Sequence, residues 1–259
     1  MAPLEKNITN TPGNSPANNR LGTENILKLI FALAIPSVVA QLINVLYNIV
    51  DRIYIGNIPE IGDVALTGVG VAFPILMIIA AFSAFVGMGG APLASIKMGE
   101  KDIDGAEKIL GNGTCLLFLL TISLMIIFLL LKEPLLYLFG ASENTFPYGN
   151  AYLTVYLFGT PFVLYTLGLN PFISIQGFSK TAMFSVLIGA VLNIVLDPVF
   201  IFVFQLGVTG AAIATVISQF ASAFWVVWFL TSSKSLLKIR KKYFSLDKEI
   251  VYKIAALGV

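Results

Sequence analysis

Five stretches of this chain carry almost no charge, over lengths that are typical of membrane-spanning helices. The longest, Thr181–Ser233, has 53 residues and one charged side chain, Asp197. A helix needs roughly 20 apolar residues to cross a bilayer, so this stretch predicts two crossings joined by a turn at Gln205–Gly210. The other four stretches are free of charge: Leu29–Val50, Val64–Ile96, Ile109–Leu131 and Asn144–Ser179. The sequence therefore predicts an all-α integral membrane protein, built as a six-transmembrane-helix bundle.

Composition agrees with this prediction and excludes several classes of function. Only 12% of the 259 residues are charged, against about 25% in ordinary soluble domains. The chain has no histidine and a single cysteine, Cys115, which excludes histidine-based catalysis and sites that need several thiolates. The net charge of +2 gives no reason to expect nucleic acid as a partner. We expect no enzyme and no cofactor, and we expect the lipid bilayer and small molecules as partners.

The basic residues predict the orientation of the bundle. Fourteen of the sixteen Lys and Arg residues lie on one side of the predicted helices, and only Arg52 and Lys132 lie on the other. The positive-inside rule places the basic side in the cytoplasm. We therefore expect a multi-pass plasma-membrane protein whose amino terminus is cytoplasmic. The basic cluster Lys234–Lys242 is interpreted as an ordinary stop-transfer signal, with an anionic-lipid site as the alternative.

The chain divides into four predicted segments. They are a polar leader expected to be disordered, a six-helix lobe, a basic cytoplasmic linker and the start of a seventh helix, at residues 1–22, 23–233, 234–249 and 250–259. The last segment resembles the first helix, because Ile254–Val259 repeats the pattern of Ile30–Ile35. We expect a second six-helix repeat to begin here and to be cut off, as in transporters built from parallel repeats. A chance resemblance between two apolar segments is the alternative.

Two acidic residues, Asp51 and Asp197, lie inside predicted membrane helices, since the first helix is expected to extend from Leu29 to Ile55. An ionised Asp at the centre of such a helix costs about 2.5–3.5 kcal/mol on insertion scales, so each needs a partner or a function. Asn193 precedes Asp197 by one helical turn, and a polar stripe at helical spacing leads to Asp51: Gln41, Asn44 and Asn48, with Tyr47 beside it. The pattern places polar groups on the same helix face as each acid.

Oxygen atoms around these two acids predict a cation site. Pro198 follows Asp197 and can free a backbone carbonyl one turn earlier. Carbonyl, amide and carboxylate oxygens suit a hard cation, so Na⁺ at Asp51, Asp197 and Asn193 is one possibility and a proton is the other. Asn170 and Thr215 are expected to reach the same region. The alternatives are an interfacial Asp51–Arg52 ion pair, a neutral hydrogen-bonded Asp197, and plain interhelical hydrogen bonds from Asn170 and Thr215.

Several segments together resemble the multidrug and toxic compound extrusion (MATE) transporters. Pro36, fifteen residues before Asp51, and the run Leu46–Gly56 resemble the family's first helix. The match extends over four further segments: Lys97–Lys108, Gln176–Gly177, Asn193–Phe200 and Gly210–Thr215. The resemblance covers roughly Glu24 to Val259, so this chain is similar to the first half of such a transporter.

The resemblance implies a twelve-helix antiporter of two six-helix lobes, which exports organic cations and other amphipathic toxins against an H⁺ or Na⁺ gradient. It implies a cation site in the amino-terminal lobe, with residues that match Asp51, Asp197, Asn170, Asn193 and Thr215. Other matching positions line the cavity (Asn44 and Tyr47), and we expect helix bending at Pro36 and Pro198. The second lobe, which would form the other wall of the drug cleft, is missing from this chain.

Three other functions are weighed against drug export. A flippase for lipid-linked oligosaccharides has the same broad architecture, but it is expected to line its cavity with Arg or Lys for pyrophosphate, and the predicted spans offer almost none. An intramembrane enzyme is disfavoured by the absence of histidine and of clustered acids. A structural subunit would tolerate Asp→Asn changes at both buried acids, which an exporter would not.

Overall fold

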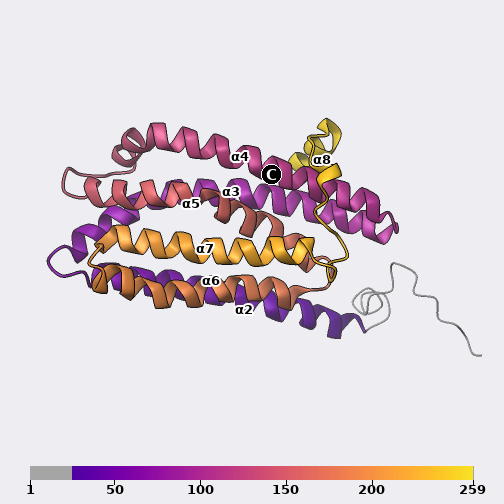
Figure 1. Cartoon of the computed structure of the whole chain (residues 1–259), viewed down its shortest axis with the longest axis horizontal. Coiled ribbons are helices and arrows are strands. Elements are labelled where there is room, and N and C mark those ends of the chain that lie inside the picture. The colour runs from indigo at the N-terminus through magenta and orange to yellow at the C-terminus, as the bar shows by residue number, and fades with distance from the viewer. Residues whose placement is uncertain (1–24, 259) are drawn as a thin grey trace, which may run out of the picture.

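The computed structural model describes residues 25–258 and confirms a bundle of six long helices (Figure 1). The helices are α2 (Ile26–Gly56), α3 (Gly62–Gly99), α4 (Ile103–Leu138), α5 (Phe146–Ser174), α6 (Ser179–Pro198) and α7 (Gly207–Thr231). A π-helix, η1 (Val199–Val203), continues α6, and each of the six spans is long and apolar enough to cross a membrane. The expected leader, residues 1–22, lies outside the described residues.

Several element boundaries differ from those predicted. The helix expected to reach Ser179 ends at Ser174, and a turn with Gly177 at φ 84° separates α5 from α6. The turn expected at Gln205–Gly210 is shorter, since α7 already begins at Gly207. A short helix, α8 (Lys248–Gly258), begins two residues before the expected position 250. Tertiary contacts decide where a helix ends, so a hydropathy pattern leaves its ends uncertain by a few residues.

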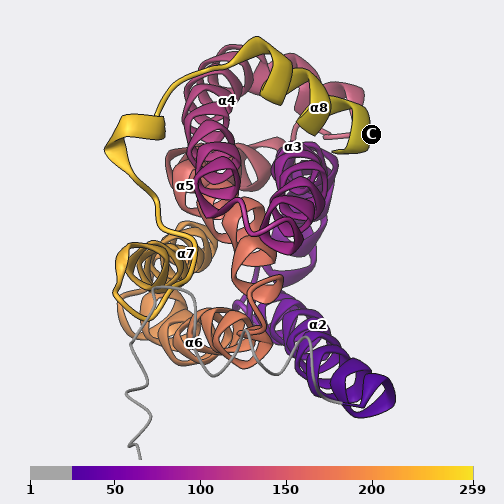
Figure 2. The same cartoon turned by 90° about the vertical axis from the view of Figure 1, so that its right-hand side faces the viewer.

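Helix α5 forms the centre of the bundle and α2 lies at its edge (Figure 2). Within the most apolar stretch of each helix, 61% of the residues of α5 are buried, against 6% for α2. Helices α3 and α4 pack on one side of α5, whereas α6 and α7 lie on the other and α2 packs chiefly against α6. The edge position of α2 leaves one of its faces open along much of its length.

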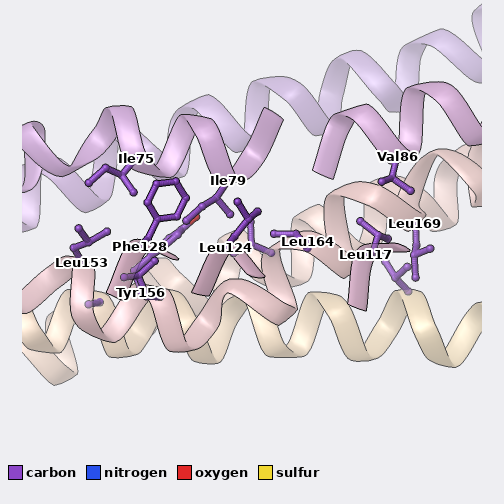
Figure 3. Packing of buried hydrophobic residues seen from close by; sticks show 14 of the residues in the cluster. Ile75, Ile79, Val86, Leu117, Leu124, Phe128, Leu153, Tyr156, Leu164 and Leu169 are labelled. Carbon is purple, nitrogen blue, oxygen red and sulfur yellow. The ribbon is translucent and has the colours of Figure 1, made fainter. Parts of the chain in front are cut away.

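Branched and aromatic side chains from α3, α4 and α5 form the apolar core (Figure 3). Ile75 and Ile79 of α3 lie in the same cluster as Leu153 and Leu164 of α5. In a bilayer, helices associate by close packing and by small residues that let backbones approach. Glycines allow that approach where α3 crosses α5, since a Cβ atom at Gly68 would lie 2.6 Å from the Thr145 carbonyl oxygen.

Most basic residues gather at one end of the bundle. This end holds the start of α2, the junction of α3 with α4, the junction of α5 with α6 and the end of α7; we call it the basic end. Arg52 and Lys132 lie near the opposite end. The folded arrangement is therefore the one that the charge pattern predicts, and a cytoplasmic location of the basic end stays a prediction.

Candidate functional site

A cavity of about 600 Å³ lies between α2, α3, α5, α6 and α7. Hydroxyl and amide side chains make up much of its wall, together with small and apolar residues. Among the described residues that line it, none is Asp, Glu, Lys or Arg. Its polar lining residues are Ser37, Gln41, Asn44, Tyr47, Thr166, Asn170, Ser174, Ser179, Asn193, Thr215, Ser218, Gln219 and Ser222.

The two intramembrane acids meet beside this cavity. Asp51 is one of three buried residues of α2, and it lies on the side of that helix that packs against α6. Asp197 lies at the end of α6 and is fully buried. The two carboxyl groups lie close enough to share a hydrogen bond when one of them carries a proton. Residues 146 positions apart in the chain thus form one acid pair.

Asn193 and Thr215 connect the acid pair to the cavity wall. The Asn193 side-chain amide donates to Asp197 Oδ1 at 3.1 Å and to Thr215 Oγ1 at 3.3 Å. Both residues line the cavity and both are buried. The structure therefore brings together four of the predicted site residues, from helices α2, α6 and α7.

Three oxygen atoms of this group have no hydrogen-bond partner in the described structure. They are Asp51 Oδ1, Asn193 Oδ1 and Asp197 Oδ2, and all three are buried. A buried acceptor without a donor costs about 1–3 kcal/mol. A proton on one carboxyl group would remove part of that cost, and a monovalent cation between the three oxygens would remove more of it. These oxygens therefore fit the predicted cation site.

Tyrosines surround the acid pair, and sequence reasoning found only one of them. Tyr47 lines the cavity close to the side chains of Asn48 and Gln219. Tyr152 of α5 is buried beside Thr215 and near Asp51. Its ring stacks on that of Tyr156, with centroids 6.2 Å apart. The signal in the sequence was the four-residue spacing of these two tyrosines, which places them on one face of α5.

Asn170 does not join the acid pair, contrary to the expectation that it reaches the same region. Its side-chain amide donates to Ser185 Oγ at 2.9 Å and to the Ala182 carbonyl at 3.2 Å. Ser185 precedes Asn193 by eight residues in α6, a distance of about 12 Å along a helix. Asn170 instead belongs to a second polar group, in the part of the cavity nearer the basic end. Asn44 also lines the cavity, and its carbonyl accepts the Asn48 amide at 2.7 Å.

The sequence model of the MatE family matches residues 36–199. The chain belongs to the MatE family. This membership confirms the resemblance found in the sequence and makes the chain part of a multi-pass membrane transporter, which is not an enzyme. The match begins at Pro36 and includes Asp51, Asn193 and Asp197, whereas Thr215 lies beyond its end.

Relatives of this MATE chain include multidrug export proteins and solved transporter structures. The chain is 28% identical over 235 residues to the multidrug export protein MepA of Staphylococcus saprophyticus, covering 90% of this chain and 51% of that protein. A crystal structure of MATE in complex with MaD3S is 28% identical, with a TM-score of 0.85 over 92% of this chain and 53% of that one. An outward-facing multidrug resistance MATE transporter is also 28% identical, with a TM-score of 0.82 over 89% and 51%. The chain spans about half the length of the curated relatives it matches.

Three further residues near the site of this MATE chain were singled out in the sequence. Pro36 is one of the few buried residues of α2, and Pro198 lies at the point where α6 gives way to the π-helix η1. Bending at either proline stays a prediction. Among the ion pairs of residues 25–258, none joins Asp51 to Arg52, whose guanidinium lies 4.9 Å from the centre of the Phe73 ring. The interfacial ion pair considered for Asp51 is therefore not observed.

Proposed function

We propose that this chain is the amino-terminal lobe of a cation-coupled antiporter that exports amphipathic organic cations. The observation that carries the proposal is the buried Asp51–Asp197 pair beside a cavity of about 600 Å³. Membership of the MATE family supports it, and so do the relatives that are named multidrug export proteins. Residues 23–233 form the lobe in this proposal, residues 234–249 the connection, and a second lobe that begins near residue 250 completes the cleft.

The acid pair couples two cations because both are attracted to the same two carboxylates. Two adjacent carboxylates repel each other, and the repulsion is strong in a medium that screens poorly. Either H⁺ or Na⁺ at Asp51, Asp197 and Asn193 relieves that repulsion, and so does the positive charge of a drug in the adjacent cavity. Because the same negative charge attracts both cations, binding of the coupling ion weakens the hold on the drug.

Helix bending converts this competition into transport. Pro36 and Pro198 are the two positions where α2 and α6 lack a regular backbone hydrogen bond, and both helices line the cavity. Neutralisation of the acid pair favours a conformation in which α2 and α6 approach each other and the cavity shrinks. The coupling ion thus shifts the population toward the state that has released its drug.

The lining of the cavity disfavours the flippase considered above. A pyrophosphate group calls for Arg or Lys, and the described lining residues include neither. Hydroxyl and amide groups among apolar side chains instead suit a cationic amphiphile. In the proposed orientation the basic end faces the cytoplasm, so the acid pair lies in the outer half of the membrane.

Efflux from cells tests the proposal. Cells that express the complete open reading frame are loaded with a fluorescent organic cation, and inward Na⁺ and pH gradients are imposed separately. We expect one of the two gradients to drive efflux and its collapse to stop it. Efflux at the same rate with and without either gradient would contradict cation coupling. If none of the cationic dyes is exported, the proposal of drug export is contradicted.

Asn170→Ala in the complete protein is expected to weaken drug binding without altering the dependence on the coupling ion. The amide contacts Ser185 and Ala182, about two turns of α6 away from Asn193. The substitution removes one hydrogen-bonding group from the cavity wall that a drug would contact. We expect the KM for the drug to rise by about fivefold to tenfold, since one hydrogen bond contributes about 1 kcal/mol. Asn57→Ala, at an exposed position after α2, serves as the control. A shifted ion dependence in the Asn170 variant would place this residue in the cation site after all.

A further inference from the structure

The segment that joins α7 to α8 is bound to the bundle along its whole length. The sequence predicted a basic linker at residues 234–249. In the structure, residues 232–247, which we call the strap, run from the end of α7 past α4 and contain the 3₁₀ turn η2 (Lys241–Tyr243) (Figure 2). Side chains from α4 and from the α5–α6 turn hold this segment.

Gln176, in the turn after α5, holds the first part of the strap. Its side chain is fully buried, and its Oε1 atom accepts hydrogen bonds from the backbone of the strap. Two backbone amides donate to it, Leu236 at 2.8 Å and Leu237 at 3.0 Å. The Ser235 hydroxyl lies 2.9 Å from it, and the single proton of that hydroxyl is shared between this oxygen and the Leu237 carbonyl at 2.6 Å. Its amide donates to the Phe172 carbonyl at 2.7 Å. The strap therefore supplies the donors that a buried amide oxygen requires.

Glu107, in the first turns of α4, holds the next part. Its side chain is only 4% exposed, although the sequence analysis gave this acid no role of its own. One carboxylate oxygen accepts the Lys238 amide at 3.2 Å, and the other accepts the Arg240 guanidinium. A buried carboxylate is costly unless it is paired and hydrogen-bonded. The two contacts with the strap supply both kinds of partner.

The strap ends at a further contact, again with α4. The fully buried Asn112 accepts the Asp247 amide at 2.6 Å, and the Asp247 carboxylate pairs with Lys108 at 2.7 Å. The Lys108 ammonium, with the amide of Glu249, lowers the pKa of Asp247 below its ordinary value. Between these contacts, a Cβ atom at Gly111 would lie 2.5 Å from the Tyr243 carbonyl oxygen. Only a glycine allows the strap to approach α4 this closely.

Helix α8 comes directly after the strap and lies against α3. Ile254 is fully buried, and a Cβ atom at Gly89 would lie 2.1 Å from the Ile254 carbonyl oxygen. The start of α8 is therefore set by the strap and its position by close packing on α3. Both Glu107 and Gln176 belong to the segments that carried the family resemblance, and the acid pair gives neither of them a role.

We propose that Gln176 and Glu107 are positioning residues that fix the strap, so that α4, α5 and α8 move as one unit. When the chain beyond α8 moves, the fixed strap makes α4 and α5 move with it. Helices α2 and α6, which line the cavity, lie on the other side of α5 from α4 and α8. This inference rests on the proposal that a second lobe follows α8, and it does not depend on whether the acid pair binds a cation.

Hydrogen–deuterium exchange of the chain in lipid nanodiscs tests the proposal without measuring transport. We expect slow exchange at the amides of Leu236, Leu237 and Lys238, because buried side chains accept them. Gln176→Ala is expected to speed the first two and Glu107→Ala the third, by about tenfold or more for the loss of one such contact. Exchange in α8 is expected to rise in both variants.

The matched control is Glu133→Ala, since Glu133 is an exposed acid at the other end of α4. It is expected to leave the exchange of both the strap and α8 unchanged. Amides of the α5 core should stay slow in every variant, which separates release of the strap from global unfolding. If Glu107→Ala does not accumulate, Arg240→Ala removes one of the two contacts from an exposed side chain and is expected to speed exchange at Lys238.

Two results would overturn the proposal. One is fast exchange of the strap amides in the unmodified chain, since the strap would then be a loose linker. The other is release of the strap with no change in α8, since the strap would then not fix that helix. Transport assays decide neither outcome, so the strap and the proposed function fail independently.

Discussion

Replacing Asp197 by Asn in the complete protein is expected to abolish drug efflux while leaving membrane insertion and folding intact. Asn keeps the size of the side chain and can still contact Asn193, but it carries no negative charge to exchange between drug and coupling ion. Because Asp197 is fully buried next to Asp51, the substitution also removes the repulsion between two carboxylates. We expect thermal stability to be unchanged or raised, and efflux to fall by about a hundredfold, as for a group on which the coupling step depends.

Asp51→Asn is expected to give the same loss, since the one remaining carboxylate has no second carboxylate beside it whose repulsion a cation would relieve. Efflux of a fluorescent cation and the amount of protein in the membrane are measured side by side. Asp63→Asn is the matched control, because Asp63 is an exposed acid in the first turn of α3 at the same end of the bundle. Full efflux by the Asp51→Asn, Asp197→Asn double variant would disprove the coupling mechanism and would favour a structural role for both acids.

Gly68→Ala is expected to destabilise the lobe more than a Gly→Ala substitution at any other point where α3 contacts α5. A Cβ atom there would lie 2.6 Å from the Thr145 carbonyl oxygen and 3.0 Å from the Gly149 amide nitrogen, and both atoms belong to the backbone. The backbone at the start of α5 cannot give way as a flexible side chain does, so α3 and α5 must separate. Overpacking of this kind costs about 1–3 kcal/mol, which we expect to appear as a lower thermal midpoint of the purified protein.

Gly70→Ala provides the control for that prediction within the same helix. A Cβ atom at Gly70 meets nothing within 4 Å, and alanine is favoured over glycine in a helix by about 1 kcal/mol. The two variants are therefore expected to shift the thermal midpoint in opposite directions. Equal shifts would show that helix propensity, rather than the approach of α3 to α5, decides the effect at Gly68.

The local features of this site were readable from the sequence because they depend on helical spacing. Asp51 with its polar stripe, and Asn193 one turn before Asp197, are patterns within single helices. The proximity of the two acids does not depend on spacing within a helix. It results from the packing of α2 on α6, which no spacing within either helix specifies.

Contacts between distant segments account for what the sequence did not reveal. Tyr152 approaches Thr215 only because α5 is the central helix of the bundle. The sequence places Asn170 in a predicted membrane helix, but it does not give the position of this residue along the bundle axis relative to the acid pair. For that reason Asn170 was expected near Asp51 and Asp197. It contacts Ser185 instead, which lies further toward the basic end.

The sequence by itself determined that this chain contains six helices long and apolar enough to cross a membrane, which family it resembles and which two acids lie inside those helices. These properties depend on length, hydropathy and charge, which add up along the chain. Only the tertiary structure decided that the acids form a pair, that Glu107 is buried and that residues 232–247 are a fixed strap. Each of these depends on hydrogen bonds and close approaches between residues far apart in the chain, and such contacts exist only after the helices have packed.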